Sequence, residues 1–271
     1  MLKLFYITNK PKVAEIAQAA GVDRIFLDME YIGKAERQPG MDTVQNHHTV
    51  ADVRAIRKVL NKSELLVRVN PIHSGSQKEI DETIAAGADV IMLPMWKSAE
   101  DVRKFIAYVN GRAKTLLLLE TQEAADCLDE VLTLDGIDEI HIGLNDLHLA
   151  QHKKIMFELL VDGTVDALTE RIKAAGLPFG IGGVGAVGAG LKIPAELVLS
   201  EHHRLGSSMA ILARAFCDTE KITDPGQVRE IFDNGIRRNR EYEAFLAGQP
   251  DAYFTQQHEA LRALLKEITG N

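Results

Sequence analysis

The segment 116–149 constrains the fold most strongly, because it contains two short apolar runs that each lead to a carboxylate. The run 116–119 ends before Glu120, and the run 139–142 is followed within one turn by Asp146. A helical pattern joins the two runs, so the segment predicts a strand–helix–strand unit with parallel strands. The two carboxylates then lie at the same end of the sheet and can converge on one point.

A converging pair of carboxylates has a limited range of chemistry. Two neighbouring carboxylates repel each other unless a proton or a cation lies between them. Ligand sets made only of oxygen favour hard ions such as Mg²⁺ or Mn²⁺ over zinc. Glu120 and Asp146 are therefore candidate metal ligands. The alternative is that Glu120 pairs with an arginine while Asp146 caps a helix.

Strand and helix patterns alternate from the first residues onward, and each strand pattern is short and apolar. The predicted strands are Leu4–Thr8, Arg24–Leu27, Leu65–Val69, Val90–Leu93, Leu116–Leu119, Glu139–Ile142, Phe179–Gly182 and Ser207–Leu212. The predicted helices are Pro11–Ala20, Val50–Leu60, Lys78–Ala86, Ala99–Val109, Glu123–Leu132, Val165–Ala175 and Ala195–Arg204. Eight such units predict an α/β fold of the (β/α)8, or TIM, barrel type. A doubly wound sheet is the alternative, but the regular spacing favours a single barrel.

The chain divides into a barrel core, residues 1–224, and C-terminal helices, residues 225–271. The stretch Pro225–Phe245 can serve as the eighth barrel helix. A further helix, Glu259–Ile268, is surplus to a barrel and amphipathic, with apolar side chains at Leu261, Leu264, Leu265 and Ile268. We expect this extension to pack on a neighbouring subunit of a homo-oligomer; packing over the barrel's own surface is the alternative.

Composition excludes several classes of protein. The 271 residues carry a formal net charge of −8, and the chain has no long basic run, which argues against nucleic acid as a partner. No apolar stretch approaches the roughly 20 residues of a membrane span, and the N-terminus does not resemble a secretory signal. Cys127 and Cys217 form no paired motif, so a reducing cytoplasm is the expected compartment.

Catalytic groups of such barrels lie at the carboxyl ends of the strands. Those ends carry Asn9, Asp28, Glu30, Tyr31, Arg68, Asn70, Pro94, Met95, Glu120, Asn145, Asp146, Gly182, Gly183 and Arg214. Arg68 alternates with Val67 and Val69, so its side chain points to the opposite face of its strand. It can neutralise the carboxylates or stabilise an oxyanion beside a metal ion, and we expect the second role.

At this point the sequence resembles the HpcH/HpaI aldolase/citrate lyase family, over roughly two-thirds of the chain from the second to the eighth strand. The most specific part is LLLLETQEAADCLDEVLTLDGIDEIHIGLNDLHL, and LDMEY, LLVRVN and GADVIMLPM support it. The resemblance implies a metal-dependent pyruvate aldolase or related lyase on a (β/α)8 barrel, with Mg²⁺, Mn²⁺ or Co²⁺ as cofactor.

The resemblance also implies roles for individual residues. Glu120 and Asp146 would bind the metal, and Arg68 would contact the keto oxygen of pyruvate. The backbone amides of Leu144, Asn145 and Asp146 would hold the pyruvate carboxylate, and Asp28 would orient metal-bound water. Tyr31 departs from the family pattern, because aldolases of this type commonly have a proton-transferring histidine there and citrate lyases commonly have aspartate. Tyr31 would then line the substrate site.

The long segment after the second strand offers substitutes for that histidine. His47 and His48 lie at its end, and His48 is better placed for proton transfer because it stands beside Thr49, the expected N-cap of the next helix. Lys34 and Arg37 can bind a distal carboxylate of the substrate; a solvated basic loop is the alternative.

The patterns around several other polar residues give little indication of a catalytic or metal-binding role. His148 and His152 can share a helix face, but no third zinc ligand stands beside them. His141 is expected to be a satisfied core histidine, and His202 and His203 to lie on the surface. No predicted strand from the second to the eighth contains a lysine, which disfavours an imine mechanism.

The sequence therefore predicts a class II aldolase that cleaves a 4-hydroxy-2-oxo acid to pyruvate and an aldehyde through a metal-stabilised enolate. Three alternatives remain open. They are an acyl-CoA lyase with the same metal site, a phosphate-binding barrel that uses Gly182–Gly190, and a catalytically silent barrel.

Overall fold

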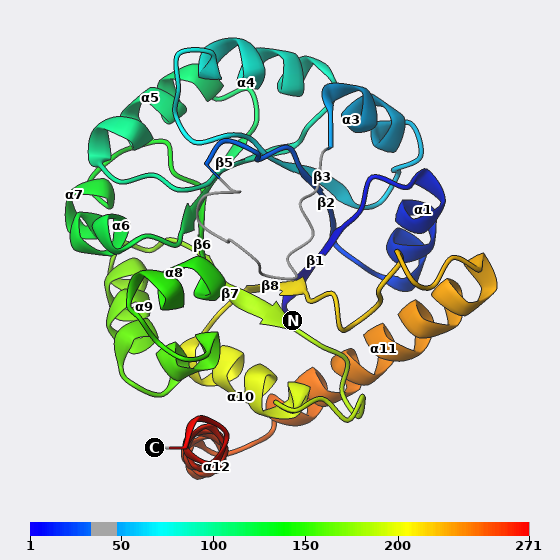
Figure 1. Cartoon of the computed structure of the whole chain (residues 1–271), viewed down its shortest axis with the longest axis vertical. Coiled ribbons are helices and arrows are strands. Elements are labelled where there is room, and N and C mark those ends of the chain that lie inside the picture. Colours follow the sequence, from blue (N-terminus) through cyan, green and yellow to red (C-terminus); the bar gives the residue numbers. More distant parts are fainter. Residues whose placement is uncertain (34–47, 271) are drawn as a thin grey trace.

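Eight parallel strands close into a barrel in the order in which they occur in the sequence (Figure 1). The computed structural model describes residues 1–33 and 48–270. The strands are β1 (Lys3–Ile7), β2 (Arg24–Asp28), β3 (Glu64–Arg68), β4 (Val90–Leu93), β5 (Lys114–Leu119), β6 (Glu139–Ile142), β7 (Phe179–Val184) and β8 (Met209–Leu212). Strand β1 pairs with both β2 and β8, which confirms the predicted (β/α)8 barrel and excludes the doubly wound sheet.

Helices surround the barrel and follow the strands in turn (Figure 1). They are α1 (Pro11–Ala20), α3 (Val50–Arg57), α4 (Ser76–Ala85), α5 (Ala99–Val109), α6 (Gln122–Asp126), α7 (Leu128–Val131), α8 (Leu144–Ala150), η1 (Met156–Leu160), α9 (Thr164–Ala174), α10 (Ala195–Leu205), α11 (Pro225–Leu246) and α12 (Asp251–Thr269). The expected caps are present, since Thr49 forms a capping box with Asp52 and Ser98 caps α5. The helix expected between β5 and β6 is instead two short helices that meet at Cys127.

Alternation along the strands divides the buried side chains between two layers. One set packs between the strands and the surrounding helices. The other fills the barrel interior and consists of Phe5, Phe26, Leu66, Val90, Met92, Leu116, Leu118 and Met209. Leu66 belongs to this inner set, so Arg68, two residues further along β3, points into the barrel as expected.

The amino-terminal end of the barrel is closed by a buried ion cluster around Arg24. Arg24 is fully buried and donates to Glu139 and, at 2.7 Å, to Glu64. Burial would raise the pKa of Glu139, but hydrogen bonds from Arg24 hold it below its usual value. Lys114 also pairs with Glu64 here. The expectation that β5 carries no lysine is therefore wrong, but Lys114 lies at the end of the strand opposite Glu120.

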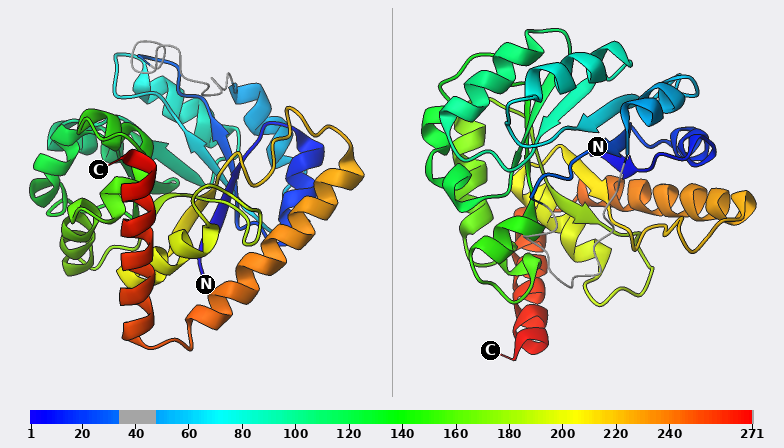
Figure 2. Two further views of the ribbon diagram at one scale, coloured as in Figure 1. Left: turned by 60° about the horizontal axis from the view of Figure 1, so that its bottom comes forward. Right: turned by 45° about the horizontal axis from the view of Figure 1, so that its top comes forward.

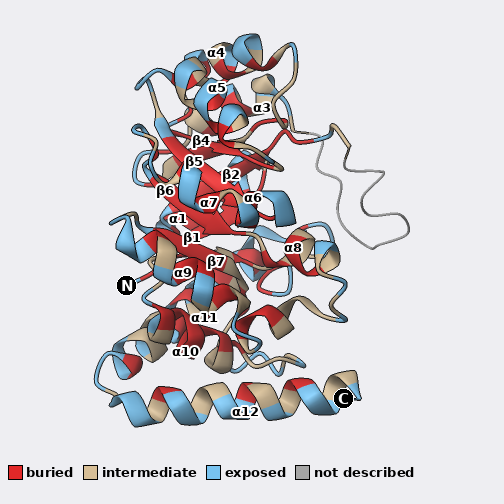
Figure 3. Cartoon of the chain, turned by 90° about the vertical axis from the view of Figure 1, so that its left-hand side faces the viewer, coloured by how far each residue is buried: buried red, intermediate tan, exposed pale blue. Residues whose placement is uncertain are grey.

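The surplus C-terminal helix, α12, lies along the outside of the barrel beside α10 (Figure 2). Its buried residues follow one side of the helix, and Leu261 and Leu265 are almost fully buried (Figure 3). At the start of the contact, the His203 ring of α10 stacks on Phe254 at 4.5 Å. The barrel's own surface therefore covers this apolar face. Packing on a neighbouring subunit is not needed to bury it, and a homo-oligomer stays a prediction.

No helix in the two described ranges is both long enough and apolar enough to cross a membrane.

Candidate active site

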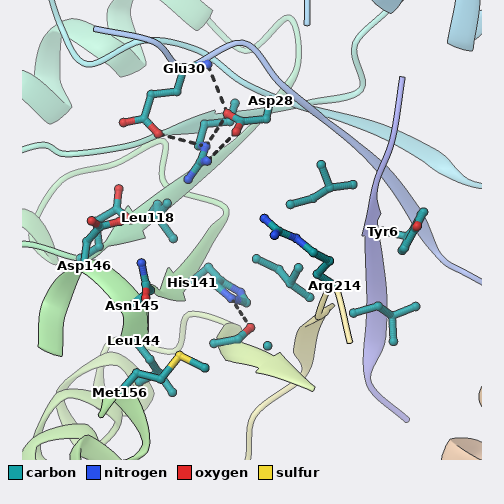
Figure 4. Close-up of a pocket in the computed structure, with 18 of the residues that line it drawn as sticks. Tyr6, Asp28, Glu30, Leu118, His141, Leu144, Asn145, Asp146, Met156 and Arg214 are labelled. Atoms are coloured by element: carbon teal, nitrogen blue, oxygen red, sulfur yellow. Dashed lines mark hydrogen bonds and ion pairs between the residues drawn. The ribbon is translucent and has the colours of Figure 1, made fainter. Parts of the chain in front are cut away.

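A cavity of about 600 Å³ opens at the carboxyl ends of the strands, where barrel enzymes place their catalytic groups (Figure 4). Its lining residues are Tyr6, Ile7, Asp28, Glu30, Arg68, Leu118, Glu120, His141, Gly143, Leu144, Asn145, Asp146, Met156, Gly182, Gly183, Ile211, Leu212, Arg214, Cys217, Asp218, Thr219 and Glu220. The cavity thus brings together Arg68, Asp28, Glu120 and the Leu144–Asp146 segment, as the sequence predicted.

Arg68 is held by two carboxylates from β2 and the loop after it. Its Nε and Nη2 atoms each donate to Asp28, both at 2.8 Å, and its Nε lies 3.4 Å from Glu30. Burial would lower the pKa of Arg68, but the charges of Asp28 and Glu30 raise it above its usual value. The guanidinium is therefore permanently charged and fixed in direction, as an oxyanion-stabilising group must be. This pairing gives Asp28 a positioning contact that the sequence did not reveal.

Glu120 follows β5 directly and lies almost fully buried on the cavity wall. Burial raises its pKa well above the usual value, Arg68 lowers it, and the charge of Asp146 raises it further. The Met95 amide donates to Glu120 Oε1 at 3.2 Å from a backbone with φ of 51°, a conformation uncommon for a non-glycine residue. A Cβ atom at Gly143 would lie 2.8 Å from that of Glu120, so only glycine fits between Glu120 and α8.

The donor set at this end of the cavity fits a hard divalent cation. The carboxylates of Asp28, Glu30, Glu120 and Asp146 line the cavity together with the guanidinium of Arg68. Burial, and after it the charges of Asp146 and Glu30, raise the pKa of Glu120, so a cation beside this carboxylate would stabilise its charged form. Among the described residues, no group of three or more histidine, cysteine, aspartate or glutamate side chains could hold a metal ion. A metal here would therefore depend on the pair Glu120 and Asp146, with substrate and water completing its coordination.

The candidate proton-transfer residue, His48, lies next to Asp28. The Asp28 amide donates to His48 Nδ1 at 2.9 Å, so a neutral His48 carries its proton on Nε2. Protonation of Nδ1 would break this contact, which counts against abstraction of a proton by that atom. The role of His48 in proton transfer therefore stays a prediction.

Other candidates from the segment after β2 are placed differently. Tyr31 is 63% exposed and does not line the cavity, although the side chain of Asn70 accepts its amide proton at 3.0 Å. Lys34, Arg37 and His47 lie outside the described residues.

His141 is a residue whose surroundings the sequence did not reveal. It points from β6 to the cavity lining, and its Nε2 lies 3.0 Å from the Gly182 carbonyl oxygen. Its Nδ1 is buried and has no hydrogen-bond partner among the described residues, so the expectation of a fully satisfied core histidine is wrong. Burial lowers the pKa of His141 to about 4, so the ring is neutral at physiological pH. A histidine between Ile140 and Ile142 in the middle of a short strand was the available signal.

Two other expectations about histidines are wrong. His202 is buried on the inner side of α10, where burial lowers its pKa to about 3 and Ser207 Oγ lies 2.9 Å from Nδ1. Helix α8 ends at Ala150, before His152, so His148 and His152 do not share a helix face. The shared helix face that their spacing allowed is therefore not formed.

The glycine-rich segment after β7 offers little to a phosphate group. Gly182 and Gly183 line the cavity. Further along the segment, the Val187 amide donates to Asn239 Oδ1 at 2.9 Å and the Gly188 amide to Glu196 Oε1 at 3.0 Å. Side chains of α10 and α11 thus occupy amides that a phosphate would use.

A closed parallel barrel with an acidic, arginine-containing mouth is typical of barrel enzymes. The chain belongs to the HpcH/HpaI aldolase/citrate lyase family, whose model matches residues 2–196. This match begins at β1, earlier than the sequence motifs suggested, and ends before β8.

Curated relatives that are named as aldolases match between half and two-thirds of the chain. A hydroxypyruvate/pyruvate aldolase from Roseovarius nubinhibens is 26% identical over 207 residues, which are 63% of this chain and 73% of the relative. A 4-hydroxy-2-oxovalerate aldolase from Novosphingobium aromaticivorans is 26% identical over 201 residues, 63% and 71% of the two chains. A 2-keto-3-deoxy-L-rhamnonate aldolase from Escherichia coli is 26% identical over 50% of this chain and 56% of its own.

Solved structures share the fold. An HpcH/HpaI aldolase from Desulfitobacterium hafniense DCB-2 superposes with a TM-score of 0.64 at 15% identity, covering 84% of this chain and 93% of its own. The citrate synthase SbnG gives a TM-score of 0.61 at 15% identity, covering 84% and 92%. At this identity the likeness supports the barrel fold alone.

Proposed function

We propose that this protein is a divalent-metal-dependent aldolase that reversibly cleaves a 4-hydroxy-2-oxo acid to pyruvate and an aldehyde. The observation that carries the proposal is the arrangement of Glu120, Asp146 and Arg68 around one cavity. Burial and the charge of Asp146 both raise the pKa of Glu120, so this pair has the electrostatics of a cation site. The three aldolase relatives support the reaction class.

Glu120 and Asp146 would hold the metal ion, which when bound supplies Lewis-acid stabilisation of negative charge on oxygen. Arg68, fixed by Asp28, would donate to the keto oxygen of the substrate as negative charge develops there. The backbone amides of Leu144–Asp146, on the cavity wall, would hold the carboxylate.

In the cleavage direction, the proton of the 4-hydroxyl passes to a base, for which His48 or a water molecule is the candidate, and the bond between C3 and C4 breaks. The electron pair of that bond passes into the enolate of pyruvate, while C4 becomes the aldehyde carbon. Protonation of the enolate at its methylene carbon then gives pyruvate. Arg68 favours the enolate over the starting ketone because its contact strengthens as charge moves to oxygen.

An acyl-CoA lyase that uses the same carboxylate pair is the alternative. A saturable dependence of the cleavage rate on a CoA thioester would select it. A cytoplasmic location and a homo-oligomeric state belong to the same proposal, and sedimentation at micromolar concentration tests the second.

Removal of the metal tests the proposal. A chelator should abolish aldol cleavage, and Mg²⁺, Mn²⁺ or Co²⁺ should restore it, because two carboxylates alone bind such an ion weakly. Glu120→Gln and Asp146→Asn should each lose activity while keeping the fold. Full activity of both variants in the presence of chelator would overturn the metal assignment.

A further inference from the structure

We propose that His141 is a positioning residue, whose hydrogen bond to Gly182 keeps β7 packed against Leu144 and so places the segment that holds the substrate's carboxylate. The inference rests on the aldolase function proposed above, in which the backbone of Leu144–Asp146 binds that carboxylate. His141 is fully buried in the middle of β6 and belongs to the lining of the cavity.

Both ring nitrogens of His141 are turned toward the backbone of β7. Nε2 lies 3.0 Å from the Gly182 carbonyl oxygen (Figure 4), and because a carbonyl can only accept, the neutral ring carries its proton on Nε2. A Cβ atom at Gly180 would lie 2.3 Å from Nδ1, so this nitrogen lies against the Gly180 Cα atom. The ring therefore acts through Gly182, and neither nitrogen is available to exchange a proton with the substrate.

The unpaired nitrogen distinguishes His141 from a residue that only fills space. Nδ1 is buried and has no hydrogen-bond partner in the part of the chain that the structure describes. An apolar side chain would fill the same space without burying a lone pair, so the histidine costs stability here. A donor to Gly182 is the contribution that an apolar residue could not make.

Gly182 has a backbone conformation that such a donor can hold in place. Its φ is +43°, in the left-handed region that favours glycine. From Gly180 to Gly183, β7 takes three steps along the chain where β8 takes two, so β7 contains a β-bulge. Bulges change the direction of backbone groups and are frequent beside active sites. The hydrogen bond from His141 fixes the carbonyl group of Gly182 within this bulge.

Gly182 in turn supports the start of the Leu144–Asp146 segment. A Cβ atom at Gly182 would lie 2.7 Å from Leu144 Cδ1, so the buried Leu144 side chain packs directly on this glycine. On its other side, a Cβ atom at Gly143 would lie 2.8 Å from that of Glu120. The segment is thus held between β7 and Glu120, and a displacement of Gly182 moves its amides relative to Glu120.

The test measures hydrogen–deuterium exchange at the methyl group of pyruvate in the metal-loaded enzyme, with kcat and KM determined separately. Glutamine and methionine are unbranched and of similar length, but only glutamine can donate to Gly182. His141→Met should raise KM for pyruvate about tenfold, the scale of one buried hydrogen bond, and keep kcat within about threefold. His141→Gln should keep both values within about threefold of wild type.

Val90→Ala is the control for a general loss of stability. Val90 belongs to the same inner layer of the barrel but not to the cavity lining. This variant should lower the melting temperature and leave KM for pyruvate unchanged. An increase of KM in Val90→Ala equal to that in His141→Met would mean that any weakening of the barrel interior has this effect, which overturns the specific role of His141.

Nitrogen-15 NMR of the histidine side chains tests the hydrogen bond without any reaction. The His141 signals, identified by their loss in His141→Gln, should show a neutral ring with its proton on Nε2 throughout the neutral pH range. Burial lowers the pKa of this ring to about 4, so no titration is expected there. A proton on Nδ1 instead would overturn the contact with Gly182.

The kinetic results also separate the role of His141 from the proposed function. An unchanged KM in His141→Met, or a loss of about 100-fold in kcat in His141→Gln, contradicts positioning, and the second result would indicate direct proton transfer. Absence of exchange in the metal-loaded wild type contradicts the aldolase function itself, and with it the carboxylate that the segment would hold. A wild type that exchanges normally beside an unchanged His141→Met contradicts only the role of His141.

Discussion

At the scale of single residues, the site depends on the direction of one guanidinium. Asp28 holds Arg68 through two hydrogen bonds of 2.8 Å, so the remaining donor capacity faces the cavity. Arg68→Ala should cost at least about 3 kcal/mol of transition-state stabilisation, measured through kcat/KM, as loss of a main oxyanion donor does. It also removes the charge that pairs with the buried Asp28 carboxylate, so Arg68→Lys is the cleaner variant. Arg68→Lys should fold with a similar melting temperature yet lose about 100-fold in kcat/KM, and activity within tenfold of wild type would contradict this role.

Glu120 should behave as a functional residue that costs stability. In the metal-free protein its charge is buried and repelled by Asp146, so Glu120→Gln should abolish cleavage and raise the free energy of unfolding by about 0.5–2 kcal/mol. Chemical denaturation of the metal-free protein measures the change in the free energy of unfolding. Glu123→Gln, on the exposed start of α6, should leave activity unchanged. A destabilised Glu120→Gln protein would mean that the carboxylate serves the fold instead.

The raised pKa of Glu120 also predicts a pH dependence. The folded protein holds the Glu120 proton more tightly than the unfolded chain does, so the folded protein binds more protons in the interval between the two pKa values. The metal-free protein should therefore lose stability as the pH rises from about 4.5 through the raised pKa. Denaturation curves across this interval should show a smaller loss for Glu120→Gln. An identical pH dependence in the two proteins would contradict the shift.

The contact between His48 and Asp28 separates two roles for this histidine. Asparagine can accept the Asp28 amide proton in place of Nδ1 but cannot titrate. If His48 positions Asp28, His48→Asn should stay within about tenfold of wild-type kcat, while His48→Ala should fall further. If the ring transfers protons, both variants should lose about 100-fold or more. The pH profile of kcat, measured for all three proteins, distinguishes these results.

At the scale of elements, α12 is held by the barrel's own surface. Leu261 is fully buried within the chain, so Leu261→Ala should destabilise the protein by about 2–5 kcal/mol without changing its sedimentation. Leu264→Ala, at a half-buried position of the same helix, should cost less. A change of oligomeric state in Leu261→Ala would show that this face also serves an interface.

The ends of the helices and strands could be predicted closely where local chemistry sets them. Strand ends lie within two residues of their expected positions, and the caps Thr49 and Ser98 occur as predicted. The break at Cys127 could not be predicted, because the apolar spacing continues across it. The surface that α12 covers depends on the shape of α10 and η1, which periodicity does not describe.

At the scale of the whole molecule, barrel closure places Arg68, Glu120 and Asp146 in one cavity. Their convergence was predictable, because parallel strands place their carboxyl ends at one edge. The position of Arg214 on the cavity wall was not, because it depends on a loop whose Cys217 and Phe216 contact Tyr6 and Phe232, from distant parts of the chain. The partnerless nitrogen of His141 likewise follows from packing rather than from spacing.

Hydrogen–deuterium exchange at the methyl group of pyruvate tests the central claim most directly, because it reports enolate formation without any knowledge of the aldehyde. In deuterium oxide, the protein with Mg²⁺ or Mn²⁺ should exchange these hydrogens at a rate proportional to enzyme concentration. Chelator should stop the exchange, as should Glu120→Gln. No exchange above background in the metal-loaded wild type, or the same rate in the chelated protein, would contradict a metal-stabilised enolate at this site.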